Sequence, residues 1–158
     1  MIGLLVAALI TVGATDRPLA DRTVGPWVVR QEEAGSPLRS LFTSVEQPGS
    51  HLALMLECDG TFFVDVMATK GFVYADDDEA TLIFDGGVER KAPALMTGHK
   101  LLHISATSLM EDIIGAARMG VRLRRKDGTT RDEFFALPDL SAGKPLLRQF
   151  CPAPVKPF

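Results

Sequence analysis

Two alternating apolar runs on either side of one turn constrain this chain more than any other feature. The first run, Leu52–Cys58, places every second residue on one face and ends in a cysteine. The second run, Phe62–Ala68, repeats the alternation after Asp59-Gly60, a pair typical of two-residue type I′ turns. A period of two is that of a half-buried strand. The sequence therefore predicts an antiparallel hairpin whose buried face includes Cys58.

Further short β-like runs, each bounded by glycine or proline turns, cover most of the remaining chain. They are residues 27–32, 39–46, 81–84, 88–92, 100–106, 121–126 and 130–137. A helix is predicted from Ser108 to Gly120, because Ser108 and Glu111 match a capping box and an apolar stripe follows at helical spacing. A second short helix is predicted at Lys144–Phe150. The predicted fold is mostly β: an antiparallel β-sandwich or open barrel with one crossover helix and a short C-terminal helix.

The N-terminal residues indicate export to the periplasm or beyond. Ile2–Ala14 carries no charge, is shorter than the roughly 20 residues that cross a bilayer, and ends in small residues that suit a signal peptidase. We expect a signal peptide at 1–14, a polar leader at 15–24, one domain at 25–151 and a proline-rich tail at 152–158, without an integral membrane span. The alternative is that the apolar run belongs to the domain.

The two cysteines of the chain, Cys58 and Cys151, are expected to form a disulfide. An even number of cysteines in a short exported chain favours pairing. Two buried free thiols are the alternative. Neither cysteine lies in a CxxC motif or at ligand spacing from a histidine, so no structural metal site is predicted.

Charge and motifs exclude several classes of function. The net charge of −3 does not suit a nucleic-acid-binding protein, which needs a basic excess. The chain contains neither a G-x-S-x-G nor an H-E-x-x-H motif, and we expect no catalytic centre and no cofactor. Asp76–Glu79 lacks the EF-hand pattern and is interpreted as a solvated hairpin tip, with a weak calcium site as the alternative. His99 and His103 are too far apart on a strand to share a metal.

One cluster of basic residues suggests a binding surface. Arg122 and Arg124 share a parity opposite Val121, and Arg131 is expected across a second two-residue turn at Asp127-Gly128. The three arginines would then form a cationic strip on one face of a hairpin, suited to an anionic envelope component. The alternative is an edge hairpin that its charges keep soluble.

The order of these features resembles small periplasmic bacterial proteins of the invasion-associated locus B family and the related periplasmic proteins associated with type VI secretion. The matching residues are Gly25-Pro26-Trp27, Leu56–Gly60, Phe84–Gly87, Phe135–Leu137 and Cys151. The resemblance implies a signal peptide, a β-sandwich and a disulfide, without an established catalytic centre. We expect a non-enzymatic periplasmic accessory module that binds an unknown protein or envelope component in secretion or host interaction. The alternative is a small periplasmic hydrolase or an inhibitor of a cell-wall-degrading enzyme.

Overall fold

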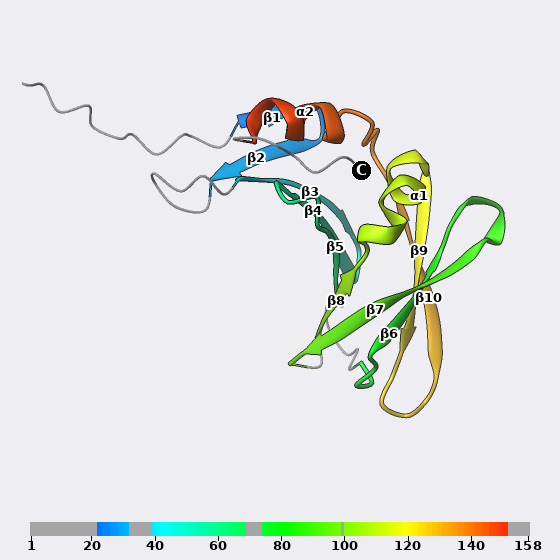
Figure 1. Ribbon diagram of the computed structural model, residues 1–158. Helices are drawn as coiled ribbons and strands as arrows, with labels where there is room; N and C mark the ends of the chain where they lie inside the picture. The colour runs from blue at the N-terminus through cyan, green and yellow to red at the C-terminus, as the bar shows by residue number, and fades with distance from the viewer. Residues whose placement is uncertain (1–21, 32–38, 69–73, 99, 152–158) are drawn as a thin grey trace, which may run out of the picture.

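The computed structural model describes residues 22–31, 39–68, 74–98 and 100–151. Within these residues the strands form one antiparallel sheet in the order β1-β2-β3-β4-β5-β8-β7-β6-β9-β10 (Figure 1). The predicted mostly-β fold is confirmed. The expected signal peptide, the start of the leader, the C-terminal tail and His99 lie outside the described residues. The last leader residues, Arg22–Val24, form strand β1.

Most strands follow the predicted runs to within three residues at each end, but β7 extends five residues beyond its predicted end and β1 was not predicted. They are β1 (Arg22–Val24), β2 (Trp27–Gln31), β3 (Arg39–Gln47), β4 (Ser50–Glu57), β5 (Phe62–Ala68), β6 (Glu79–Ile83), β7 (Glu89–Thr97), β8 (Leu101–Ser105), β9 (Arg118–Arg124) and β10 (Thr130–Ala136).

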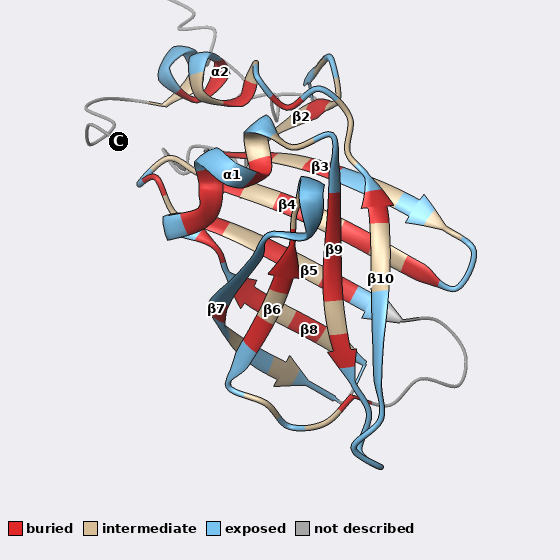
Figure 2. Cartoon of the chain, turned by 90° about the vertical axis from the view of Figure 1, so that its right-hand side faces the viewer, coloured by how far each residue is buried: buried red, intermediate tan, exposed pale blue. Residues whose placement is uncertain are grey.

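The sheet bends into two halves that share β7. The first part of β7 pairs with β6, and its second part pairs with β8. Figure 2 shows β6, β9 and β10 crossing in front of β3, β4 and β5, so that the two halves enclose the core. On the open side, the Gln47 side-chain amide of β3 donates to Glu133 of β10 at 3.2 Å. This arrangement is a sandwich that approaches a closed barrel, as the sequence predicts.

Strand alternation places the core between the two halves. Buried and half-buried residues alternate along the whole of β4, and the side chains of Leu52, Leu54 and Leu56 are fully buried (Figure 2). Each of these leucines lies opposite a buried partner in β3 or β5. Burying a side chain of this size contributes about 1.5–3 kcal/mol to the free energy of folding. The alternating apolar residues are therefore the main contribution to the stability of this fold.

The loop between β4 and β5 has three residues rather than the predicted two. The Gly60 amide donates to the Glu57 carbonyl, and the Glu57 amide donates to Thr61, both at 2.9 Å. Gly60 has a φ of 87°, which favours glycine. The predicted type I′ turn is therefore wrong. Leu56 and Phe62 can pair on the same buried face only if the loop has an odd number of residues. A shift of one residue in the pairing would move every side chain of one strand to the opposite face of the sheet.

The crossover helix is shorter than predicted. A 3-10 turn at Thr107–Leu109 precedes helix α1 (Met110–Gly115), and Gly120 lies inside β9. The predicted capping box is wrong, since neither helical segment has a side-chain cap. Instead, the Thr107 hydroxyl accepts the Phe62 amide at 3.0 Å, which attaches the turn to β5.

Helix α2 (Gly143–Phe150) lies beside β1 and β2 and matches the second predicted helix (Figure 1). It begins against Trp27, which is fully buried: a Cβ added at Gly143 would lie 2.9 Å from the indole ring. Directly after α2, Cys151 forms a disulfide with Cys58, with 5.5 Å between the two Cα atoms. In the described part of the chain, no helix has the length and apolar character needed to span a membrane.

Candidate functional site

The three arginines of the predicted strip do not lie on one face of their hairpin. Arg131 pairs across the hairpin with Leu123, whereas Arg124 pairs with Thr130. Residues that pair directly in an antiparallel sheet share a face. Arg131 therefore projects on the opposite face from Arg122 and Arg124, and the expectation of a single strip is wrong.

The loop of this hairpin explains the difference. The Gly128 amide donates to the Arg125 carbonyl at 2.9 Å, and the Arg125 amide donates to Thr129 at 2.8 Å. The loop therefore has three residues, as after β4. A two-residue turn at Asp127-Gly128 would have moved the register by one residue, and such a shift moves every side chain of one strand to the other face.

Carboxylates hold all three guanidinium groups. Arg122 contacts Asp132 at 2.8 Å and Glu89 at 2.9 Å, Arg124 contacts Asp77, and Arg131 contacts Glu133. Hydrogen bonds from Arg122 hold the pKa of the Asp132 carboxyl below its usual value. Asp77 belongs to the acidic run Asp76–Glu79, for which the sequence predicts a solvated hairpin tip, but the structure places Asp77 against Arg124 of β9 instead. An anionic ligand would have to compete with these internal partners.

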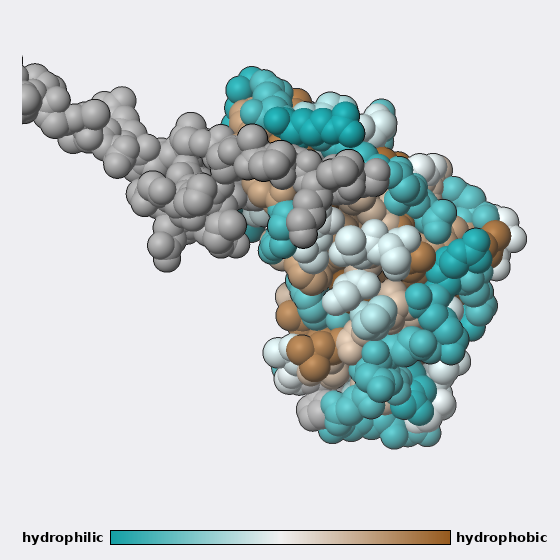
Figure 3. Space-filling view, viewed as in Figure 1, coloured by the Kyte–Doolittle hydropathy of each residue, from teal (hydrophilic) through white to brown (hydrophobic). Residues whose placement is uncertain are grey.

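A carboxylate–imidazole pair that the sequence did not predict lies on the outer face of the sheet. Asp65 of β5 contacts Nδ1 of His103 of β8 at 2.6 Å, and the Phe63 ring lies 4.7 Å from the imidazole. Leu95, which pairs with His103, is 64% exposed, and Met67 is 45% exposed. Figure 3 shows apolar side chains gathered near the ends of β7 and β8. A carboxylate can orient a histidine for proton transfer, and the side chains of Asp65 and His103 are both partly exposed.

The described residues contain no cluster of three or more histidine, cysteine, aspartate or glutamate side chains that could hold a metal ion. His103 therefore has no set of further ligands around it in this part of the chain, and Asp76–Glu79 does not form such a cluster.

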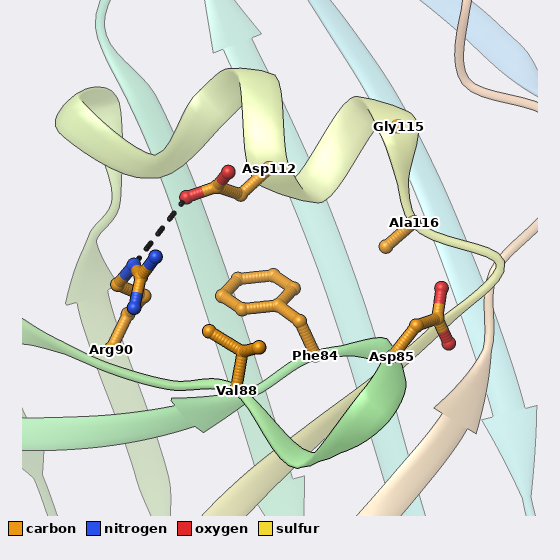
Figure 4. Close-up of a pocket in the computed structure, with 7 residues that line it drawn as sticks. All are labelled: Phe84, Asp85, Val88, Arg90, Asp112, Gly115 and Ala116. Atoms are coloured by element: carbon orange, nitrogen blue, oxygen red, sulfur yellow. Dashed lines mark ion pairs between the residues drawn. The ribbon is translucent and has the colours of Figure 1, made fainter.

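A hollow of about 290 Å³ lies between α1 and the turn that joins β6 to β7 (Figure 4). We call it the Phe84 pocket; its lining residues are Phe84, Asp85, Val88, Arg90, Asp112, Gly115 and Ala116. Small-molecule sites have volumes of about 300–1,000 Å³. The Phe84 pocket is therefore of a size for one side chain of a partner rather than for a large cofactor.

Local hydrogen bonds hold the turn that forms the pocket. The Phe84 amide donates to the Val88 carbonyl at 2.9 Å, and Gly86 and Gly87 adopt positive φ angles of 76° and 78°. The Asp85 carboxylate accepts the Ala117 amide at 3.1 Å and so attaches the turn to the segment after α1. Two glycines in succession suit this backbone because other residues rarely adopt a positive φ.

The pocket combines an apolar floor with charged groups at its ends. In Figure 4 the Phe84 ring points toward α1, with Arg90 and Asp112 on one side and Asp85 on the other. The Arg90 Nε and Asp112 Oδ2 atoms are 3.9 Å apart, too far for a hydrogen bond, and both side chains are half exposed. Val88, at 43% exposed, adds an accessible apolar surface.

A second hollow, of about 220 Å³, shares Phe84 and Asp85 with the first. On its side of the turn, the Arg118 guanidinium lies 4.1 Å from the centre of the Phe134 ring. A Cβ added at Gly120 would lie 2.6 Å from this ring, so glycine provides the space that the ring occupies. The Phe84–Gly87 turn thus separates two adjacent concave surfaces.

The sequence contained one signal for the pocket. The sequence predicts a turn at Phe84–Gly87, and the same residues carry part of the family resemblance, but no pattern identifies the Asp85 carboxylate as a contact to another element. Asp112 lies on a helix that the sequence placed only approximately. A turn motif alone does not show which helix will cover it.

Comparison with solved structures assigns the architecture. The crystal structure of invasion associated protein B from Bartonella henselae superimposes with a TM-score of 0.55 over 81% of this chain and 95% of that chain. In fold, the chain resembles invasion associated protein B. At 11% sequence identity, the likeness to invasion associated protein B establishes a shared fold. No family model matches the chain, and no curated protein matches it in sequence.

Proposed function

We propose that this chain is an exported accessory module that binds a protein partner through the Phe84 pocket. The observation that carries the proposal is the pocket itself, in which an apolar floor lies between charged groups, on a turn that Asp85 attaches to the segment after α1. An apolar patch with a few polar groups at its rim is the usual composition of a protein-binding surface. The fold of invasion associated protein B supports an accessory role in host interaction.

The Phe84 pocket suits a partner better than the predicted arginine strip. The arginines lie on two faces and already contact carboxylates. In the pocket, by contrast, Val88 is exposed and the Arg90–Asp112 contact is long. Protein partners bind mainly through apolar anchors, whereas exposed ion pairs at a rim contribute little.

Export of the chain can be tested at its N-terminus. We expect protein recovered from the periplasmic fraction or the medium to begin at or near Thr15, because signal peptidase would cleave after the small residues that end at Ala14. Mass spectrometry of the intact protein measures this directly. A folded protein that keeps Met1 and is found only in the cytoplasmic fraction would contradict export.

Partner binding can be tested by cross-linking in living cells. A photoreactive benzoylphenylalanine replaces Val88 in the producing bacterium, and the matched control carries it at Leu95, an exposed aliphatic residue of β7 outside the pocket. We expect illumination to give a covalent adduct with one protein from position 88 and little or none from position 95. Gel shift and mass spectrometry identify the product.

The two positions distinguish the possible binding surfaces. An adduct from position 95 alone would move the binding surface to the outer face near Asp65 and His103. Absence of an adduct at both positions, in cells that grow in contact with host material, would contradict a protein partner at either surface.

A further inference from the structure

We propose that the Phe84 pocket receives a lysine or arginine side chain of the partner, with its charged head at Asp85 and its stem over Phe84 and Val88. This inference rests on the proposed function and adds the chemistry of the ligand. It follows from the charges that line the pocket, from the position of the aromatic ring and from the volume of the hollow.

The charges of the pocket favour a cation. Arg90 and Asp112 lie close enough to compensate each other's charge, although their contact is long. Asp85 remains: among the described residues its carboxylate has one hydrogen bond, from the Ala117 amide, and no cationic side chain contacts it. The lining therefore has a net negative charge, and a basic group that enters the pocket would compensate it.

The apolar floor selects the type of cation. The Phe84 ring lies between the Arg90–Asp112 pair and Asp85, and Val88 lies beside it (Figure 4). Lysine and arginine carry methylene stems that pack on apolar surface while the charged head stays near water. A cation close to an aromatic face gains additional attraction. The pocket therefore matches a long basic side chain better than a small inorganic cation.

An acidic ligand fits this geometry poorly. To reach Arg90 it would have to replace Asp112 as the partner of the guanidinium, and it would place a third carboxylate in a space that already contains those of Asp85 and Asp112. Carboxylates brought together in one small pocket repel each other. The volume of about 290 Å³ is also close to the lower limit for ligand sites, which favours a single inserted side chain.

Nuclear magnetic resonance of the oxidised full chain tests this inference without the partner. The probes are the N-acetyl methylamides of lysine, arginine, norleucine and glutamate, and the signals are the amides of residues 85–88 and 115–117. We expect saturable shifts with lysine and arginine, weaker binding of norleucine and no saturable shift with glutamate. Stronger binding of glutamate, equal binding of norleucine, or no shift with any probe would overturn the inference.

Two neutralising variants and one control locate the charge effect. Asp85→Asn keeps an oxygen that can accept the Ala117 amide, and Asp112→Asn changes the pocket from the helix side. We expect each to weaken lysine binding roughly two- to fivefold, the range of a partly exposed ion pair. The control, Glu46→Gln, removes an exposed carboxylate of β3 outside the pocket and should leave binding unchanged. Unchanged affinity in both pocket variants would contradict a charge-based site.

The outcomes remain distinguishable from those of the cross-linking test. Lysine binding without an adduct at position 88 would contradict the protein partner but keep the preference of the pocket. An adduct at position 88 without lysine binding would keep the partner and overturn the ligand chemistry.

Discussion

Removing the Cys58–Cys151 disulfide is expected to lower the free energy of unfolding by about 2–5 kcal/mol. The bond joins the loop after β4 to the residue after α2, across a sequence separation of 93. In the chain-entropy model, closing a loop of this length stabilises the folded state by about 4–5 kcal/mol. Since small domains are stable by about 5–15 kcal/mol, the loss is a large part of the total.

The measurement is denaturant unfolding of the double variant Cys58→Ala/Cys151→Ala. Wild-type protein unfolded in the presence of a reductant is the matched control, because it loses the same bond without a change of sequence. Both should show the same lowered midpoint. An unchanged midpoint, or two free thiols titrated in the non-reduced wild-type protein, would contradict the disulfide.

Replacing Trp27 with alanine is expected to lower the free energy of unfolding by about 3–5 kcal/mol. The indole is fully buried between β2 and the start of α2, and its Nε1 donates to the Leu140 carbonyl at 3.4 Å. The close approach of the ring to Gly143 means that alanine would leave a cavity beneath the helix. Calorimetry and denaturant unfolding measure the loss.

Two control variants separate the role of the indole from that of the strand. Trp27→Phe keeps an aromatic ring and loses the hydrogen bond, so it should cost clearly less than alanine. Val28→Ala changes the neighbouring residue on the outer face, opposite Phe42, and should have a smaller effect than Trp27→Ala. If Trp27→Ala unfolded at the same denaturant concentration as Val28→Ala, the indole would not anchor α2.

The sequence predicts the strands because burial imposes a strict period of two on apolar residues. The two Asp-Gly pairs, however, predict two-residue turns where the structure has three-residue loops. Asp-Gly occurs both in two-residue turns and in three-residue loops whose glycine has a positive φ. In the first hairpin the error left the buried face intact, since the parity of Leu56 and Phe62 fixes the register.

In the second hairpin the same error in loop length changed the predicted binding surface. The buried residues Val121, Leu123 and Phe135 share a parity that requires an odd loop, and this signal was in the sequence. The adjacent Phe134 obscured it, because an apolar residue was then present at both parities. In the structure Phe134 lies opposite Gly120 and beneath Arg118, on the face away from the buried Phe135. Arg131 was consequently assigned to the wrong face.

The candidate site could not be predicted because it depends on contacts between distant elements. Asp85 and Ala117 are 32 residues apart, and Asp65 and His103 are 38 apart. In the sequence, Asp65 and His103 lie within predicted strands and Asp85 lies in a predicted turn, whereas Ala117 contributes only its backbone amide. Which pairs meet depends on how the sheet bends and on where α1 ends, and alternation along single strands does not determine either.

Hydrogen–deuterium exchange of the protein, free and bound to the partner identified by cross-linking, tests the central claim most directly. The claim is that the partner covers the Phe84 pocket. We predict slower exchange in the complex for residues 84–90 and 112–117, with unchanged exchange for residues 122–132 of the arginine hairpin. Protection confined to residues 122–132, with the pocket exchanging as in the free protein, would contradict the account.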